Sequence, residues 1–289
     1  TKRLMPLMSV GDLVDEDQFV AAVVPVSSRF PCLGGADEQK YVRMIDSREL
    51  SDRYVGAKAL GFFDSLTATY ALSKLINEPT EHIYVRLEAA AGLMRRSDLQ
   101  GQRLFSSTLI DGYLENRLEA VIALGEVGSQ AGADMLMETL RNANQHPEIR
   151  AGAAWSLGEM RCPSALPLLI KTFSGVDKTI RVEAARALAK LARTFRKDVI
   201  GVFPQSSHAE RPGIAWAISK AGEFSIQELL PGLVDEDARH WIAYMIGTQE
   251  KDKLLPEIEA MANLDPEVYF AVTMLWKIMS SWVYEMEEY

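Results

Sequence analysis

The chain has 289 residues, of which 48% are hydrophobic, and a formal net charge of -9 at pH 7. This length allows one or two compact domains or a single elongated array of repeats. The excess of acid argues against a protein that binds nucleic acid or an anionic membrane over its whole surface, because such partners require a positive field.

The cysteines and the apolar runs indicate the cellular compartment of the protein. Cys32 and Cys162 are far apart in the sequence, so we expect free thiols, a reducing compartment and a cytoplasmic location. The longest apolar runs, such as Phe19–Val26, are far shorter than the roughly 20 residues of a spanning helix. We therefore expect no membrane insertion, and the first ten residues do not resemble a secretory signal.

Residues 1–50 form the least regular part of the chain. Asp15–Val24 is predicted to be a helix capped by Asp15, and Ser27–Asp37 a loop because of its proline and paired glycines. A second helix is expected over Glu38–Leu50. We interpret this segment as a cap or degenerate first repeat that covers the open end of an array.

Residues 51–289 are predicted to form a repeat array with a C-terminal cap. The repeating feature is an arginine followed seven positions later by an apolar residue, with copies about 30 residues apart. The pairs are Arg53 with Leu60, Arg86 with Leu93, Arg117 with Leu124, Arg150 with Leu157, Arg181 with Leu188, Arg211 with Ile218 and Arg239 with Ile246. In an eighth copy, Val268 precedes Leu275 and the arginine is missing.

Each repeat is expected to contain two helices. The residue after the apolar position is usually small, which lets the first helix of each repeat pack closely on its neighbours. The second helices are expected at Ser65–Ile76, Asp98–Ile110, Ala131–Leu140, Pro163–Phe173, Phe195–Phe203, Ser225–Leu233 and Lys253–Ala262. The predicted fold is an all-α, right-handed α-solenoid of about eight helical hairpins.

Two stretches carry a family resemblance. Val85–Leu93 (VRLEAAAGL) and Ile180–Leu188 (IRVEAARAL), together with LGEVG at Leu124–Gly128, resemble the HEAT-like repeats of the family named after phycobilisome lyases. The resemblance covers about residues 51–283 and implies HEAT-like hairpins. Such repeats occur in chromophore lyases, assembly factors, deoxyhypusine hydroxylases and adaptors, so it implies a fold more than an activity.

The repeated arginines are expected to be structural. A residue that occurs once in every unit serves the unit, and a guanidinium can bridge neighbouring turns by binding carboxylates or carbonyls. Glu115, Glu148 and Asp177 lie near enough in the sequence to be such carboxylates.

We predict no catalytic residues, no metal site and no cofactor. Deoxyhypusine hydroxylases hold a di-iron centre with His-Glu dipeptides, and this sequence contains none. His82 and His146 occupy equivalent turns two repeats apart, which places them about 20 Å from each other, too far to share a metal ion. Gly-rich phosphate loops, Gly-x-Ser-x-Gly elbows and Cys-x-x-Cys pairs are also absent.

The second helices supply the candidate binding residues. Alignment by the period places Tyr70, Arg103 and Asp134 at one position, and Lys74, Ser107, Glu138 and Lys171 four residues further on. Their mixed charges are typical of a concave groove for one particular protein, whereas a phosphate-binding groove would be uniformly basic. The alternative is a groove that is merely solvated.

A basic segment gives a second candidate surface. Arg186, Lys190, Arg193 and Lys197 would form one stripe if the helix continues through them, and the stripe either binds an anionic partner or is solvated. Arg186 also occupies the same repeat position as Trp155 and Trp216. A Trp-Arg-Trp line would resemble a protein-binding hot spot, although the tryptophans could instead pack between repeats.

Three functions are compatible with these patterns. The first is a non-catalytic, cytoplasmic adaptor or assembly scaffold that binds a partner protein, as part of a larger complex, through its concave helical surface. The second, implied by the family resemblance alone, is a chromophore-lyase-like subunit that attaches a bilin to a protein. The third is a HEAT-like protein that binds nucleic acid, which the acidic charge disfavours.

Overall fold

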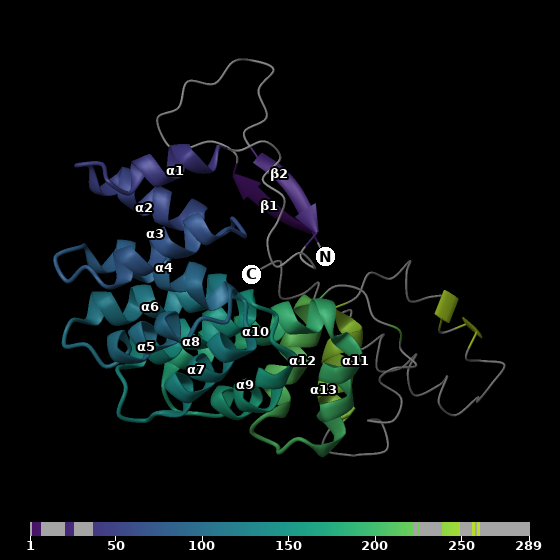
Figure 1. Ribbon diagram of the computed structural model, residues 1–289. Coiled ribbons are helices and arrows are strands. Elements are labelled where there is room, and N and C mark those ends of the chain that lie inside the picture. The colour runs from purple at the N-terminus through teal and green to yellow at the C-terminus, as the bar shows by residue number, and fades with distance from the viewer. Residues whose placement is uncertain are drawn as a thin grey trace. The chain divides into compact units, whose positions relative to one another are not determined.

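The computed structural model describes residues 2–6, 21–25, 37–221, 225, 239–248, 256–257 and 259–260. Its helices are α1 (Glu38–Met44), α2 (Leu50–Leu60), α3 (Leu66–Ile76), α4 (Ile83–Arg95), α5 (Leu99–Thr108), α6 (Leu114–Val127), α7 (Gln130–Arg141), α8 (Pro147–Glu159), α9 (Leu166–Phe173), α10 (Lys178–Thr194), α11 (Arg196–Val202), α12 (Arg211–Lys220) and α13 (Arg239–Gly247). Two 3-10 turns, η1 (Pro163–Ala165) and η2 (Phe203–Gln205), adjoin α9 and α11. The prediction of an all-α repeat fold is confirmed (Figure 1).

The chain forms two compact units, Thr1–Leu136 and Met137–Tyr289, and the boundary falls within α7. In the first unit, the first helices of successive hairpins, α2, α4 and α6, contact one another, and α3 and α5 pack against α4. In the second unit, α8, α10, α12 and α13 contact one another in the same order, with α9 and α11 against α10. Each unit is therefore a stack of helical hairpins.

The expected helix over Asp15–Val24 is wrong in its last part. Strand β2 (Ala21–Pro25) pairs antiparallel with strand β1 (Lys2–Pro6), and Leu4 lies opposite Val23. Two β-branched valines directly before a proline favour extended backbone, which explains why the helix does not form there. Residues 15–20 and most of the loop expected over Ser27–Asp37 lie outside the described residues.

The helix expected over Glu38–Leu50 is shorter than predicted, because α1 ends at Met44. The hydroxyl of Ser47 accepts a hydrogen bond from the backbone N–H of Glu49 and donates one to Asp52. Such local side-chain bonds compete with helical ones, and they turn the chain so that Leu50 begins α2.

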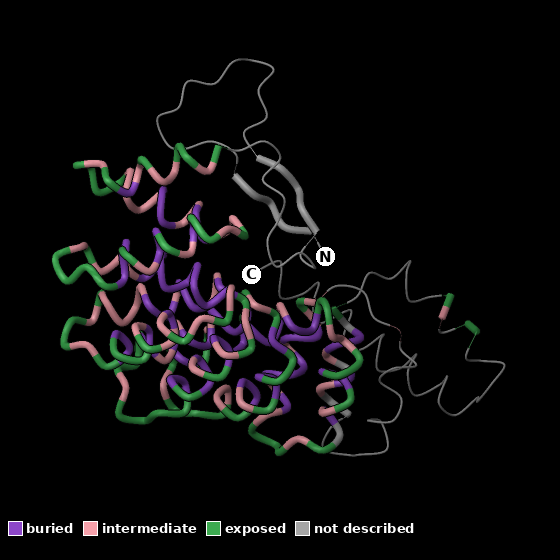
Figure 2. Tube along the Cα trace, viewed as in Figure 1, coloured by how far each residue is buried: buried purple, intermediate pink, exposed green. Residues whose placement is uncertain are grey.

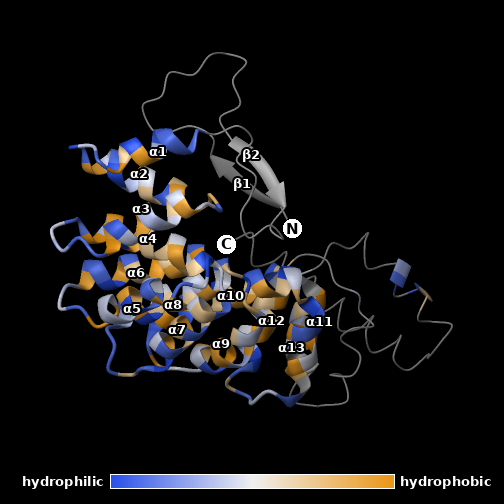
Figure 3. Ribbon diagram, viewed as in Figure 1, coloured by the Kyte–Doolittle hydropathy of each residue, from blue (hydrophilic) through white to orange (hydrophobic). Residues whose placement is uncertain are grey.

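The repeat register is confirmed in seven copies. Each described first helix buries completely, at 0% exposure, the apolar residue seven positions after its arginine: Leu60, Leu93, Leu124, Leu157, Leu188, Ile218 and Ile246. The eighth pair, Val268 and Leu275, lies outside the described residues. Figure 2 shows buried segments running through the stacked helices, and Figure 3 shows that the turns between them are largely hydrophilic.

Small residues allow the first helices to approach closely, as expected. In the first unit, a β-carbon on Gly92 would lie 2.8 Å from the Cα of Gly61, so α2 and α4 meet backbone to backbone. Ala89 and Ala90 on the same helix are fully buried. This close contact is what makes a glycine or alanine necessary at these positions.

The second helices begin near the predicted residues. Ser65 caps α3 by accepting a hydrogen bond from the N–H of Ala68, and Asp98 caps α5 through the N–H of Gln100. The helix expected to start at Pro163 opens with the 3-10 turn η1 and becomes α-helical at Leu166. The helix expected over Ser225–Leu233 lies almost wholly outside the described residues.

No helix in the described part of the chain combines the length and the apolar character that crossing a bilayer requires.

Candidate protein-binding surface

Two of the repeated arginines bind the end of the preceding helix. Arg86 donates from Nε and Nη2 to the carbonyl oxygen of Ile76, at 3.2 and 3.0 Å, and Arg150 donates from Nε to the carbonyl of Leu140 at 3.0 Å. Carbonyls in the last turn of a helix have no partner within that helix. These two arginines therefore stabilise the contact between one repeat and the next.

Arg53 uses a carboxylate instead. Its guanidinium binds both oxygens of Glu81, at 2.8 and 3.1 Å, in the turn before the next repeat. The predicted bridging role is thus confirmed for these three arginines. Asp177, which was suggested as a carboxylate for a repeated arginine, instead caps α10 by accepting a hydrogen bond from the N–H of Ile180. The guanidinium of Arg181 lies 5.4 Å from the centroid of the Phe173 ring.

The two equivalent histidines also have structural roles. The Nδ1 atoms of His82 and His146 accept hydrogen bonds from the backbone N–H groups of Tyr84 and Glu148, at 3.2 and 3.3 Å, and so cap α4 and α8. In the ranges that the structure describes, histidine, cysteine, aspartate and glutamate nowhere gather in threes in a metal-binding arrangement.

A charged cluster that the sequence did not reveal connects α2, α4 and α6. Lys58 Nζ lies 3.1 Å from Glu88 and 2.6 Å from Glu126, and the hydroxyl of Tyr54 donates to Glu88 at 2.7 Å. The side chain of Glu88 is only 3% exposed. Glu88 occupies the fourth position of the VRxE motif, and this repeated glutamate was the available signal.

The cluster holds more acid than base, and its pKa values reflect this. Burial and the charge of Glu88 raise the pKa of Glu119. Burial and Glu88 also raise the pKa of Tyr54. Burial lowers the pKa of Lys58, but Glu88 and Glu126 together raise it by more. Lys58 is therefore protonated near neutral pH and compensates a buried carboxylate, which is a structural role.

The predicted residues of the first two second helices form an exposed surface. Tyr70 is 76% exposed on α3, Arg103 is exposed on α5, and the two helices contact each other. Leu66 and Leu99, each four residues before these positions, are 89% and 62% exposed, and Ile110 is 82% exposed. We call this surface the α3–α5 face; its members are Leu66, Tyr70, Lys74, Leu99, Arg103, Ser107 and Ile110.

The leucines and the isoleucine of this face were missed from the sequence. Leu66 and Leu99 begin helices that also carry buried apolar residues, and Ile110 follows the end of α5. An apolar residue at such a position is normally assigned to the core. The available signal was their position one helical turn from the variable residues Tyr70 and Arg103.

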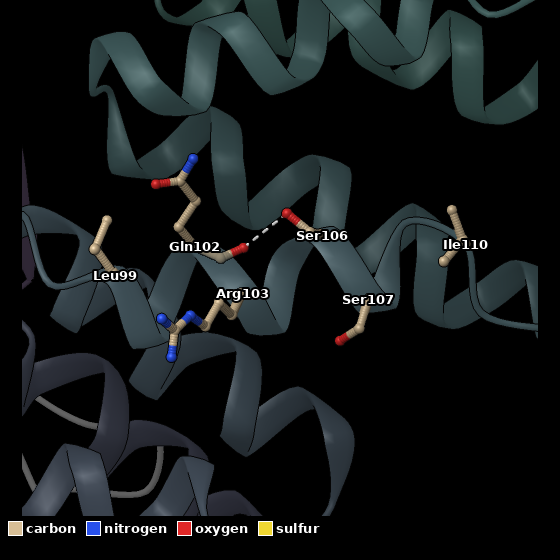
Figure 4. A pocket seen from close by; sticks show the side chains of 6 residues that line it. All are labelled: Leu99, Gln102, Arg103, Ser106, Ser107 and Ile110. Carbon is tan, nitrogen blue, oxygen red and sulfur yellow. Dashed lines mark hydrogen bonds between the residues drawn. The ribbon is translucent and has the colours of Figure 1, made fainter.

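An open hollow of about 500 Å³ runs along the exposed side of α5. Figure 4 shows its lining residues, which are Leu99, Gln102, Arg103, Ser106, Ser107 and Ile110. The hydroxyls of Ser106 and Ser107 donate to the carbonyls of Gln102 and Leu104, at 3.0 and 2.8 Å. The hollow thus has an apolar residue at each end, and the guanidinium of Arg103 lies on the side of Leu99 (Figure 4).

The remaining predicted residues of the second helices are exposed as well. Asp134 and Glu138 lie on α7, where Asp134 accepts a hydrogen bond from Gln130, and Lys171 lies on α9. Lys74 on α3 forms an exposed ion pair with Asp46 at 3.1 Å. The charges at these positions differ in sign from helix to helix, as the sequence indicates.

The basic stripe is shorter than predicted and is bound within the chain. Helix α10 ends at Thr194, because Phe195 leaves the helical conformation, so Lys197 belongs to α11. Arg186 pairs with Glu183 at 2.5 Å, and Lys190 pairs with Glu159. Arg193 donates to the carbonyl of Lys220 at 3.3 Å. Arg186 and Lys190 are thus compensated by carboxylates, whereas the contact of Arg193 with a carbonyl leaves its charge in place.

The Trp-Arg-Trp line is only half exposed. Trp155 and Trp216 are both half-buried. Lys190, not Arg186, lies over the ring of Trp155, with Nζ 5.5 Å from its centroid. The cation that lies over the first tryptophan therefore comes from a different repeat position than the sequence suggested.

The family comparison agrees with this geometry of stacked hairpins. A family model described as HEAT repeats matches the segment from α5 to α10. The matched residues are 102–189. The HEAT-like resemblance read from the sequence is thereby confirmed. No curated protein matches the chain.

Several solved structures are similar to the chain. An engineered protein is 18% identical, with 64% of this chain and 96% of that chain covered and a TM-score of 0.35. The complex of CpcE and CpcF of phycocyanin lyase from Nostoc sp. is 16% identical, with 89% and 99% covered and a TM-score of 0.37. Human deoxyhypusine hydroxylase in complex with glycerol is 18% identical, with 65% and 86% covered and a TM-score of 0.32. Because all three TM-scores are below 0.5, none bears on what this protein binds.

Proposed function

We propose that the protein is a non-catalytic, cytoplasmic adaptor or assembly scaffold that binds a partner protein, within a larger complex, through the exposed surface of its second helices. The single observation that supports this most is the α3–α5 face. It presents Leu66, Tyr70, Leu99 and Ile110 to solvent at more than half of their full exposure. Contiguous exposed apolar residues rimmed by polar ones are typical of protein–protein interfaces.

The composition of the face favours a protein over the other partner classes. Tyrosine and arginine are the residues most enriched at binding hot spots, and the face has one of each, at equivalent positions of adjacent helices. Nucleic acid requires several cations that neutralise phosphates. Here Lys74 is paired with Asp46, which leaves Arg103 as the main positive charge of the face.

The α3–α5 face is also a better candidate for the partner-binding surface than the basic stripe on α10. Arg186, Lys190 and Arg193 each have a partner in the chain. A partner protein would have to break those contacts first, whereas the apolar residues of the α3–α5 face are already free of neighbours and would gain burial.

Affinity capture from the native extract tests the proposal. The full chain is compared with Leu99→Asp, which places a charge within the apolar face, and with Val176→Asp as the matched control. Val176 is 100% exposed in the turn before α10. We expect one protein to be retained by the wild type and by Val176→Asp and to be lost with Leu99→Asp. Retention of the same proteins by all three would contradict the proposal.

A further inference from the structure

The exposed residues of α5 follow one line along the helix. Leu99 and Arg103 are four residues apart on α5 and so point to the same side, and Ile110 lies in the turn directly after the helix, where it lines the same hollow. At 1.5 Å per residue, α5 from Leu99 to Thr108 is about 15 Å long, which equals roughly three turns of an α-helix. The length of this surface thus matches a short helical segment.

A second line with the same spacing lies on the neighbouring helix, α3. Leu66, Tyr70 and Lys74 are spaced by four residues on α3, at the positions equivalent to Leu99, Arg103 and Ser107. Rows of side chains at intervals of four form ridges, and the groove between two ridges receives the ridge of another helix. An extended peptide is less suited, because helices α3 and α5 use their backbone groups internally and offer no strand edge.

The guanidinium of Arg103, which lines the hollow, indicates one polar contact with the partner. Arg103 is exposed, and within the described residues its guanidinium forms no hydrogen bond or ion pair. The serine hydroxyls beside it already donate to backbone carbonyls. A carboxylate is the group that a guanidinium binds best, through two parallel hydrogen bonds.

We propose that the α3–α5 face binds one amphipathic α-helix of the partner protein, about three turns long. Its apolar side chains lie against Leu66, Tyr70, Leu99 and Ile110, and one aspartate or glutamate in their midst binds Arg103. This inference rests on the proposed function and specifies the part of the partner that is recognised.

Peptide display against the full-length chain tests this proposal. Two libraries of randomised 16-residue peptides are used: one on a helical scaffold, and one with a proline at every fourth position, which prevents a helix. We expect binders from the helical library only, with apolar residues at intervals of three and four and one acid among them. Binders are assigned to the face when Leu99→Asp abolishes their binding and Val176→Asp does not.

The charge contact is tested with the selected peptide. Arg103→Glu should weaken its binding at least about tenfold, and replacement of the peptide's acid by arginine should restore binding to Arg103→Glu. Arg48→Glu, in the turn between α1 and α2, is the matched control and should have no effect. Binding of the arginine-containing peptide to the Arg103→Glu variant would also show that this variant is folded.

The outcomes separate this inference from the proposed function. Face-dependent binders that come from the proline library, or that bind Arg103→Glu unchanged, would overturn the helix proposal and leave the protein-binding function intact. If no peptide from either library depended on Leu99, the helix proposal would fail, and affinity capture would still decide the proposed function independently.

Discussion

Gly158 on α8 lies so close to Ala187 on α10 that a β-carbon on the glycine would be 2.7 Å from the Cα of the alanine. A contact this short involves the backbone, which cannot rotate away as a side chain can. The small residue predicted at this position is therefore required by the neighbouring first helix.

The first prediction concerns this contact. Gly158→Ala should lower the free energy of unfolding by about 1–3 kcal/mol, because overpacking forces the two helices apart. Gly201→Ala on α11 is the matched control, since a β-carbon there would meet nothing within 4 Å. Because alanine has a higher helix propensity than glycine, Gly201→Ala should raise the free energy of unfolding by up to about 1 kcal/mol. Urea denaturation measures both, and equal changes would contradict the packing argument.

The second prediction concerns the arginine that joins α8 to α7. Arg150→Leu should lower the free energy of unfolding by about 1.5–3 kcal/mol, because the carbonyl of Leu140 loses a charged donor. Arg150→Lys keeps the charge but not the guanidinium geometry, so its effect should be smaller than that of leucine. Urea denaturation measures both variants. Equal free energies of unfolding for Arg150→Leu and Arg150→Lys would show that the hydrogen bond from Arg150 to Leu140 does not stabilise the fold.

The third prediction concerns the cation of the buried cluster. Lys58→Met leaves Glu88 without its compensating charge and should lower the free energy of unfolding by about 2 kcal/mol. The loss should be smaller than that for a fully buried pair, because Lys58 is partly exposed. Lys74→Met removes the exposed pair with Asp46 and should change the free energy of unfolding by less than about 0.5 kcal/mol. Thermal and urea denaturation of the two variants should therefore differ clearly.

The fourth prediction concerns pH. Burial and Glu88 raise the pKa of Glu119 above its ordinary value of 4.5. The folded state thus binds its proton more tightly than the unfolded state, so stability falls as the pH rises through the folded pKa. Lys58, which opposes this shift, and Glu126, which adds to it, face the same cluster.

Glu119→Gln removes this titration. The variant should be more stable than the wild type near neutral pH, and its advantage should shrink as the pH falls to 4.5 and below. Urea denaturation at a series of pH values measures the difference. An advantage that grew as the pH fell would have the wrong sign for a raised pKa.

Most of the repeat architecture could be predicted from the sequence, because it depends on local spacing. Seven apolar residues placed by the arginine register, among them Leu60 and Ile246, are fully buried. The predicted capping residues Ser65 and Asp98 begin α3 and α5. Errors occurred where local chemistry interrupted a pattern, as at Phe195, where the helix ends and the basic stripe breaks.

The candidate surface was only partly predictable. Tyr70 and Arg103 were found because they vary at equivalent positions, but Leu66 and Leu99 look like core residues until a structure shows that nothing covers them. The contact of Lys58 with Glu126 joins two helices that are separated by a whole repeat, and periodicity within a helix contains no information on such pairs.

Photo-crosslinking at the α3–α5 face tests the central claim most directly. A benzophenone amino acid replaces Tyr70 in the full chain, produced in the cells from which the protein comes, and Val176 is replaced in a control. We predict one specific protein adduct from position 70, reduced when Leu99→Asp is also present, and none from position 176. Adducts of equal yield from both positions, or none from position 70, would contradict the assignment of this face as the partner-binding surface.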